Sequence, residues 1–317
     1  MRSLLPATAV VLTAFGLAAG QKPETATFET SDGVRIVADY YAAPTPPATQ
    51  PTVKPPRAPI AILLHMYPSD RSSWRPLVGL LNKAGIAALA LDIRGHGDST
   101  RPASKRLVEK RKAGDTAHYT AAVKDVLAAY TWLSAHKRNE IDFTRFGVVG
   151  ASIGCSIAMK YAATDRSVDT VVCLSPGTDY FDVDSLADIE KIGRRPILLA
   201  AASREERACR ELARKNPAAT VKIYPQRGRS RRALHGTNLF RLSTVKPYVV
   251  SFLTEHLGHP ADQPVVASIH QEAFHPLGAR AVEAIKLENL RWFSSAEEAT
   301  ARGLRPSKRD SVAPEPQ

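Results

Sequence analysis

Hydrophobic positions along the chain fall into short runs that alternate with helical patterns. Predicted strands occupy residues 60–66, 86–92, 146–150, 170–175, 196–201 and 220–225, most of them apolar throughout, and helices are predicted between them. Strands that are apolar on both faces are typical of a parallel sheet covered by helices on each side. The pattern therefore predicts an α/β fold with a mostly parallel sheet. In such sheets functional residues gather in the loops after the carboxyl ends of the strands.

Two strands are predicted before the first of these runs, at residues 25–30 and 34–41, and Ser31-Asp32-Gly33 between them is a hairpin signal. Residues 43–59 hold seven prolines, which exclude a helix or a central strand. Two strands form no core alone. We therefore interpret 43–59 as a surface loop within one domain, residues 21–258, rather than as a linker between two domains.

The first twenty residues have the composition of a secretory signal peptide. Arg2 precedes an apolar stretch, Leu4–Leu17, and small residues end at Gly20. The stretch is short for a bilayer and contains Pro6, so cleavage is expected rather than an uncleaved anchor. The prediction is a secreted or periplasmic protein with no stable membrane insertion once residues 1–20 are removed.

Composition narrows the range of partners. The formal net charge of +12 favours anionic partners, but the basic residues are spread over several loops and no nucleic-acid motif gathers them. No nucleic-acid partner is therefore expected. Three cysteines, Cys155, Cys173 and Cys209, are an odd number, and each lies in or beside a predicted core element. They are expected to be small buried hydrophobic residues rather than a disulfide framework.

One serine lies between two glycines at a predicted turn from strand to helix, in Gly150-Ala151-Ser152-Ile153-Gly154. A tight turn of this kind exposes the serine hydroxyl at the start of a helix, where free backbone N–H groups stabilise negative charge. The apolar run before Ser152 and the small-residue helix after it supply the context that this motif requires. Ser152 is therefore predicted to be a nucleophile.

With these motifs the sequence resembles the α/β-hydrolase family, and most closely its small dienelactone-hydrolase-like members. Residues 63–74 (LLHMYPSDRSSW) look like the family's oxyanion loop, and residues 89–99 (LALDIRGHGDS) are similar to its D-x-RGHG-x-S segment. The resemblance covers about residues 24–257. It implies an α/β-hydrolase fold, a Ser–acid–His triad and no cofactor.

The resemblance also assigns the other triad members. His235, in ALHGTNLF, matches the family's catalytic histidine. Glu206 falls at the acid position, after the apolar run PILLAA, where the family normally has aspartate. Ser203 and Glu206 also have the spacing of a helix capping box, which would use both side chains on the backbone instead. Glu205 and Asp179 are the alternative acids.

The oxyanion hole is expected to consist of two backbone N–H groups. One belongs to Ile153, the residue after the nucleophile, and the other to Met66, which follows His65. Backbone donors do not depend on the side chain, so methionine is acceptable at this position.

Residues 263–310 do not continue the hydrolase pattern and predict a small α+β appendage. They resemble the metal-binding module of Ada-type DNA-repair proteins, with matches that include Phe274-His275, Phe293-Ser294-Ser295 and Glu297-Glu298-Ala299. Where that module has cysteines, this chain has Ala279, Ser307 and Asp310. A degenerate module without metal is therefore expected, because structural zinc sites use thiolates and imidazoles. It is expected to pack on the hydrolase through Phe274, Trp292 and Phe293. The Pro-containing tail, 311–317, is expected to be disordered.

The function predicted from these features is a serine hydrolase that cleaves a carboxylic ester of a small molecule through an acyl-enzyme. Four arginines before His235, at positions 227, 229, 231 and 232, could attract an anionic substrate or could simply be solvated. Two alternatives stay open: a catalytically silent hydrolase fold used for binding, and a peptidase of the same fold.

Overall fold

The structure is a computed structural model, and it describes residues 22–44, 57–100, 105–226, 234–258, 263–277 and 279–307. Several predictions fall wholly outside the described residues: those on the signal peptide, the arginine run before His235, Asp310 and the tail. Of the proline-rich segment, only its two ends are described. Residues 43–44 follow the second strand of the large sheet, as a loop would, but Ala58 and Pro59 are the first two residues of the third strand, which is central, so the predicted loop is two residues too long at this end.

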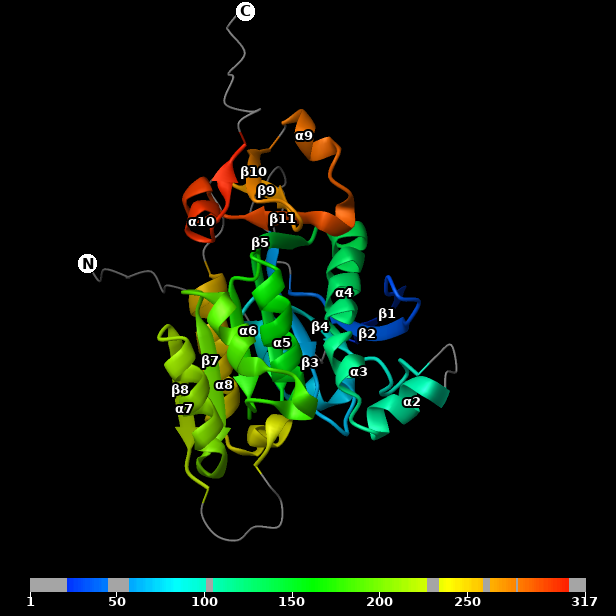
Figure 1. Ribbon diagram of the computed structural model, residues 1–317, viewed down its shortest axis with the longest axis vertical. Helices are drawn as coiled ribbons and strands as arrows, with labels where there is room; N and C mark the ends of the chain where they lie inside the picture. Colours follow the sequence, from blue (N-terminus) through cyan, green and yellow to red (C-terminus); the bar gives the residue numbers. More distant parts are fainter. Residues whose placement is uncertain are drawn as a thin grey trace, which may run out of the picture.

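An eight-stranded sheet forms the centre of the molecule (Figure 1). Its spatial order is β1-β2-β4-β3-β5-β6-β7-β8. The predicted hairpin, β1 with β2, is antiparallel and lies at one edge, and all pairs from β4 to β8 are parallel. The strands are β1 (Glu24–Glu29), β2 (Arg35–Tyr41), β3 (Ala58–Leu64), β4 (Ala87–Leu91), β5 (Ile141–Ala151), β6 (Thr170–Leu174), β7 (Ile197–Ala202) and β8 (Ala219–Tyr224).

Helices cover both faces of this sheet, as predicted from the fully apolar strands. In β3, Ile60, Ile62 and Leu64 pack on one side, while Ala61 and Leu63 pack on the other. Helices α3 to α7 cover the first side, and α1 and α8 cover the second. The helices are α1 (Arg75–Lys83), α2 (Lys105–Lys112), α3 (Thr116–Thr120), α4 (Val123–His136), α5 (Ile153–Thr164), α6 (Ser185–Ile192), α7 (Glu206–Lys215) and α8 (Val245–Leu257).

Short 3₁₀ helices follow several strands of the sheet. They are η1 (Arg71–Trp74), η2 (Tyr180–Asp182), η3 (Ser203–Glu205) and η4 (Gly236–Arg241). The chain reverses its direction of travel across the sheet at β3, which lies between β4 and β5. The loops after β3 and β5 therefore diverge at this point, and a crevice for ligands is expected there.

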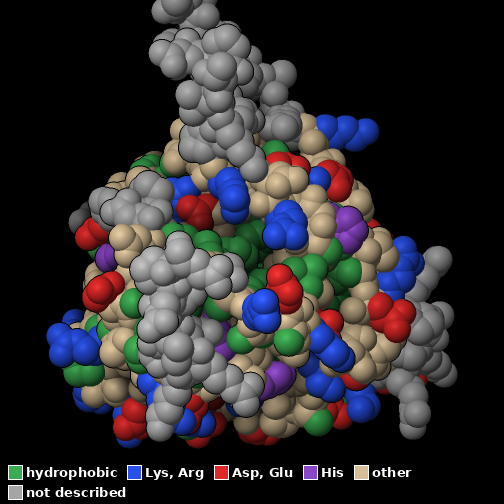
Figure 2. Space-filling model, turned by 90° about the horizontal axis from the view of Figure 1, so that it is seen from above, with side chains coloured by type: hydrophobic (Ala, Val, Ile, Leu, Met, Phe, Trp, Pro, Cys, Tyr) green, Lys and Arg blue, Asp and Glu red, His purple; other side chains and the backbone are tan. Residues whose placement is uncertain are grey.

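A second, four-stranded sheet forms the predicted appendage, with the order β11-β9-β10-β12. It lies beyond the start of β5, at the amino ends of the parallel strands (Figure 1). On the face seen in Figure 2, Lys and Arg side chains are interspersed with Asp and Glu around a hydrophobic band. The elements are β9 (Val265–Ser268), β10 (Ala273–Pro276), α9 (Arg280–Glu283), η5 (Leu287–Asn289), β11 (Leu290–Phe293), α10 (Ala296–Ala301) and β12 (Arg305–Pro306).

The aromatic contacts of this appendage differ in part from the expectation. Phe274 and Phe293 lie in the appendage's own small core, and only Trp292 packs against the core of the large domain. A buried ion pair joins the two parts, with Arg291 Nε 2.5 Å from Asp165 Oδ2. The Arg291 guanidinium also lies over the Tyr130 ring, with its Cζ 4.3 Å from the ring centroid.

All three cysteines are free and buried, as predicted. In the described part of the chain, no helix is long and apolar enough to cross a membrane.

Candidate active site

Ser152 occupies a strained turn between β5 and α5. Its backbone has φ 52° and ψ −120°, a left-handed region that residues other than glycine rarely enter. The backbone N–H of Ser152 donates to Leu174 O at 2.9 Å, which ties the turn to the neighbouring strand β6. The residue is 7% exposed and is therefore largely enclosed by its surroundings.

The two glycines of the motif are required by close packing of the backbone. A Cβ atom on Gly150 would lie 2.2 Å from the carbonyl oxygen of Gly154, and one on Gly154 would lie 2.2 Å from Leu64 O. Both distances are far below van der Waals contact, so any side chain would force the strand and the helix apart. The five-residue pattern thus reflects how tightly β5 turns into α5 beside β3.

His235 lies beside this turn, just before η4. The N–H of the next residue, Gly236, donates to Ser175 Oγ at 2.9 Å. A Cβ atom on Gly236 would lie 3.5 Å from the Cβ of Ala151 and 2.6 Å from Met66 Sδ. The imidazole therefore comes from a segment packed against both the turn at Ser152 and the loop after β3.

A carboxylate orients this imidazole. His235 Nδ1 lies 2.5 Å from Glu205 Oε1, and about a quarter of each side chain is exposed. Because a carboxylate only accepts, Nδ1 carries the proton, and Nε2 is left as the basic nitrogen. The second oxygen, Glu205 Oε2, is buried without a hydrogen-bond partner among the described residues. Among the described residues, His235 is thus the one side chain hydrogen-bonded to the Glu205 carboxylate.

The expected contact from Glu206 to His235 is not formed. Glu206 is the first residue of α7, and its carboxylate runs along the helix to Arg210, with the Arg210 Nε 2.5 Å from Glu206 Oε1. One residue of helix corresponds to about 100° of rotation, so Glu205, in the preceding 3₁₀ turn, faces His235 instead. The capping box is also absent, since Ser203 Oγ accepts from the N–H of Gln226 at 3.2 Å.

Asp179, the other alternative acid, lies in the loop after β6. Its side chain is exposed and accepts a hydrogen bond from Thr178 Oγ1 at 3.2 Å. Of the three candidate acids, only Glu205 therefore contacts His235 in the described structure. The predicted acid, Glu206, lies next to Glu205 in the chain, but its side chain points to Arg210 and not to His235.

The loop after β3 holds Met66 in a fixed orientation. The N–H of Ile93 donates to His65 Nε2 at 3.0 Å, so the ring proton of His65 is on Nδ1, which donates to Met66 O at 2.9 Å. His65 is fully buried, and burial lowers the pKa of its imidazole, which keeps the ring neutral for both contacts. Ile153, the other expected donor, is the first residue of α5, so its N–H has no partner within the helix.

Two more histidines support the same region. The carbonyl oxygen of Arg94 accepts from His96 Nδ1 and from His118 Nε2, each at 3.1 Å. Burial lowers the pKa of His96 to about 3 and that of His118 to about 4. Both rings are therefore neutral, and they anchor the RGHG loop rather than exchange protons near neutral pH.

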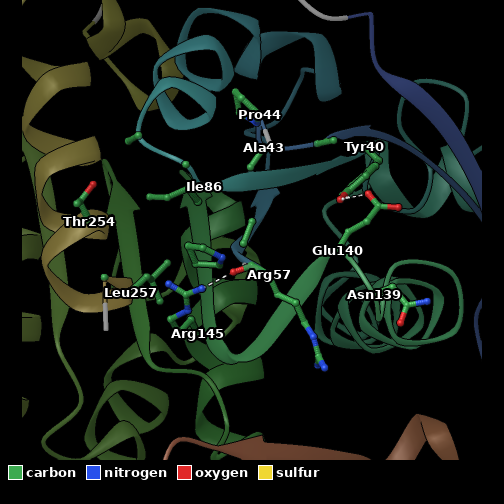
Figure 3. A pocket seen from close by; sticks show the side chains of 16 residues that line it. Tyr40, Ala43, Pro44, Arg57, Ile86, Asn139, Glu140, Arg145, Thr254 and Leu257 are labelled. Carbon is green, nitrogen blue, oxygen red and sulfur yellow. Dashed lines mark hydrogen bonds between the residues drawn. The ribbon is translucent and has the colours of Figure 1, made fainter. Parts of the chain in front are cut away.

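A cavity of about 540 Å³ lies at the opposite end of the sheet, at the amino ends of the parallel strands (Figure 3). Tyr40 donates to Glu140 Oε2 at 3.1 Å along its wall, and Arg145 donates to the carbonyl oxygen of Arg57. Its described lining holds no serine, cysteine or histidine. Across the residues that the structure describes, no group of three or more His, Cys, Asp or Glu side chains is arranged to hold a metal ion.

Comparison with known proteins agrees with this architecture. A family model described as alpha/beta hydrolase fold matches residues 59–215. The esterase Pf2001 of Pyrococcus furiosus has a TM-score of 0.54 at 19% identity over 75% of this chain and 94% of its own. A dienelactone hydrolase from Anabaena variabilis has a TM-score of 0.54 at 15% identity, and Est1E from Butyrivibrio proteoclasticus has 0.52 at 14%; each match covers 75% of this chain and 100% of the other. A search of curated protein sequences found no match.

The topology, the turn at Ser152 and these matches together establish the class of protein: the chain has the α/β-hydrolase fold, as predicted. Sequence reasoning missed Tyr180 and Ser175, which also lie near Ser152 and His235. No motif marks them, and the only signal was their position after a predicted parallel strand.

Proposed function

We propose that this protein is a serine hydrolase that cleaves a carboxylic ester of a small molecule through an acyl-enzyme. The observation that carries the proposal is the strained turn at Ser152, next to an imidazole whose Nδ1 proton is held by Glu205. Strain in a non-glycine residue persists only where the surroundings impose it, and it is common at active sites. Solved structures with this fold include an esterase and a dienelactone hydrolase, which favours ester chemistry.

In the first half of the reaction, His235 Nε2 takes the proton of Ser152 while Oγ attacks the ester carbonyl carbon. The carbonyl oxygen becomes negative, and the N–H groups of Ile153 and Met66 are the donors that we assign to it. Glu205 stabilises the imidazolium and fixes its orientation. The imidazolium then gives its proton to the departing alkoxide, which leaves as an alcohol.

In the second half, water attacks the acyl-enzyme. His235 takes one proton from the water, the Oγ–acyl bond breaks, and the imidazolium returns that proton to Ser152. The acid product leaves, and no redox change or cofactor is involved. A substrate that carries negative charge, drawn by the arginines before His235, is part of the same proposal.

A fluorophosphonate probe tests the assignment, because it labels only an activated serine. The protein is expected to be labelled, and Ser152→Ala is expected to lose the label while keeping its melting temperature. Hydrolysis of short p-nitrophenyl esters by the same pair of proteins gives the reaction directly. Labelling that survives in Ser152→Ala would refute Ser152 as the nucleophile, and a folded wild type that neither labels nor hydrolyses would favour the silent binding fold.

Two further features of the chain are proposed on the sequence alone. We infer that residues 1–20 direct secretion and are removed, and that residues 263–310 derive from an Ada-type module. The mass of the mature protein recovered from culture medium or periplasm tests the first inference. Zinc analysis of the purified protein tests the second, and a stoichiometric metal would contradict the loss of the site.

A further inference from the structure

The loop after β6 is strained beside the nucleophile. Among the described residues, four besides glycine have a left-handed φ: Ser152 at 52°, Ser175 at 56°, Phe181 at 53° and Asp182 at 58°. Three of these belong to the loop at residues 175–182, and the fourth is the proposed nucleophile. Such residues each cost of order 1–3 kcal/mol and persist only when the surroundings over-determine them.

Packing fixes the direction of Tyr180 within this loop. A Cβ atom on Gly177 would lie 2.7 Å from the Tyr180 ring, so the ring rests directly on the Gly177 backbone. The next residue, Phe181, stacks on Tyr119 with ring centroids 4.2 Å apart and an interplanar angle of 8°. The strained turn thus directs the Tyr180 ring towards His235 and the Phe181 ring towards Tyr119.

Tyr180 contacts both residues that we assign to the chemistry. Its ring meets the His235 ring edge-on, with centroids 6.2 Å apart at 88°, and its hydroxyl lies near enough to the Ser152 side chain for that side chain to lower the pKa of the phenol. The hydroxyl also donates to Ser175 O, at 3.3 Å. Hydrogen bonds between oxygens are normally 2.5–3.0 Å long, so this carbonyl holds the phenol proton only loosely.

The Tyr180 hydroxyl also stays protonated, so it can donate a hydrogen bond. Burial, followed by the nearby Cys155 and Glu205, raises the pKa of Tyr180 well above its ordinary value. The group therefore keeps its proton throughout the pH range in which esters are hydrolysed enzymatically. With that proton on Ser175 O, the phenol oxygen is free to accept from the Ser152 hydroxyl in the resting protein.

We propose that Tyr180 is a further catalytic residue, whose hydroxyl proton turns from Ser175 O to Ser152 Oγ when that oxygen loses its own proton. This inference rests on the proposed hydrolase function. His235 removes the Ser152 proton, so Oγ can no longer donate and instead becomes a negatively charged acceptor. Tyr180 then donates to it without giving up its proton, and the same contact stabilises Oγ when it leaves the acyl group in the second half of the reaction.

Tyr180→Phe removes only the hydroxyl and keeps the ring on Gly177. Because the lost hydrogen bond is made to a charged oxygen in the transition state, labelling by the fluorophosphonate probe is expected to slow by about 10- to 100-fold. On a p-nitrophenyl ester, kcat is expected to fall with KM nearly unchanged. A merely structural role would not give this split at an unchanged melting temperature.

Tyr119→Phe is the matched control. Tyr119 stacks on Phe181, the neighbour of Tyr180, but its hydroxyl donates to Arg111 O at 3.3 Å. Its labelling rate is expected to stay within about twofold of wild type. Tyr180→3-fluorotyrosine keeps the ring and a more acidic hydroxyl, so its rate is expected to equal or exceed that of wild type.

The outcomes separate this inference from the proposed function. A wild-type protein that is not labelled, or that is labelled equally as Ser152→Ala, refutes the hydrolase itself and the role of Tyr180 with it. Wild-type labelling through Ser152, with Tyr180→Phe as fast as Tyr119→Phe, overturns the role of Tyr180 alone. If 3-fluorotyrosine is as slow as phenylalanine, the ring's fit rather than its proton matters, and the inference also fails.

Discussion

Replacing Glu205 with glutamine tests which carboxylate supports the imidazole. Glu205 Oε1 lies 2.5 Å from His235 Nδ1, whereas Glu206 is engaged with Arg210 one helical turn away. Glutamine has the same length as glutamate and can still accept one hydrogen bond from Nδ1. The substitution therefore removes the negative charge and keeps the contact, so the loss measures how much the charge stabilises the imidazolium.

The magnitude follows from the geometry. Hydrogen bonds to charged groups contribute about 1.5–3 kcal/mol, and two unit charges about 4 Å apart near a protein surface attract by about 4 kcal/mol. These two estimates overlap, and solvent reduces the second because the His235 and Glu205 side chains are 27% and 28% exposed. We expect a net loss of about 2–4 kcal/mol of transition-state stabilisation, or about 30- to 1,000-fold in kcat.

Steady-state hydrolysis of a p-nitrophenyl ester by Glu205→Gln and Glu206→Gln measures the difference. Glu206→Gln is the matched control, because it removes only an ion pair along α7 that contributes about 0.3–0.5 kcal/mol to stability. Its kcat is expected to stay within about twofold of wild type. The reasoning is refuted if Glu206→Gln loses activity while Glu205→Gln keeps it. Loss in Asp179→Asn alone would move the acid to the loop after β6.

Two other expectations follow, one from the packing of a glycine and one from a buried ion pair. Gly154→Ala would place a methyl group against a backbone carbonyl, so it should displace Ser152, abolish probe labelling and lower the melting temperature. The control is Gly79→Ala, in open space on α1, which should be neutral or slightly stabilising. Equal labelling of the two variants would contradict the close packing. Arg291→Met leaves the Asp165 carboxylate buried without its cation, so the free energy of unfolding in urea should fall by about 3–5 kcal/mol. Adding Asp165→Asn should restore part of that loss, and a change below about 1 kcal/mol for the single variant would contradict the importance of the pair.

The sheet was largely predictable because its central parallel strands, β3 to β7, are mostly buried on both faces and therefore have mostly apolar sequences; β8, at the edge, is only partly buried and contains Lys222. The strands from β3 to β8 begin and end close to the predicted ones, except that β5 begins at Ile141, five residues before the predicted run at 146–150. The hairpin signal at Gly33 marks a residue with φ 76°. The turn at Ser152 was predictable for a related reason. The two glycines around Ser152 are the only residues small enough for backbone atoms to approach so closely, and this requirement is visible in the sequence.

The acid and the tyrosine could not be predicted in the same way. Choosing between Glu205 and Glu206 depends on the residue at which a 3₁₀ turn becomes α7, and helix boundaries vary by one or two residues in any sequence interpretation. The orientation of Tyr180 depends on the next two residues, Phe181 and Asp182, which adopt a left-handed backbone although neither is glycine. Local sequence preferences argue against that conformation, so only tertiary packing could reveal it.

The buried ion pair links the appendage to the active site through one helix. Ser152 immediately precedes α5, and Asp165 immediately follows this helix of twelve residues, which is about 18 Å long. Asp165 also accepts from Tyr161 at 2.6 Å and from Ser167, so Arg291 joins a network that already fixes the end of α5. The appendage therefore lies away from the turn at Ser152, while Arg291 binds the far end of the helix that follows this turn. Its place at the amino ends of the parallel strands separates it from the loops at their carboxyl ends, where Ser152 and His235 lie.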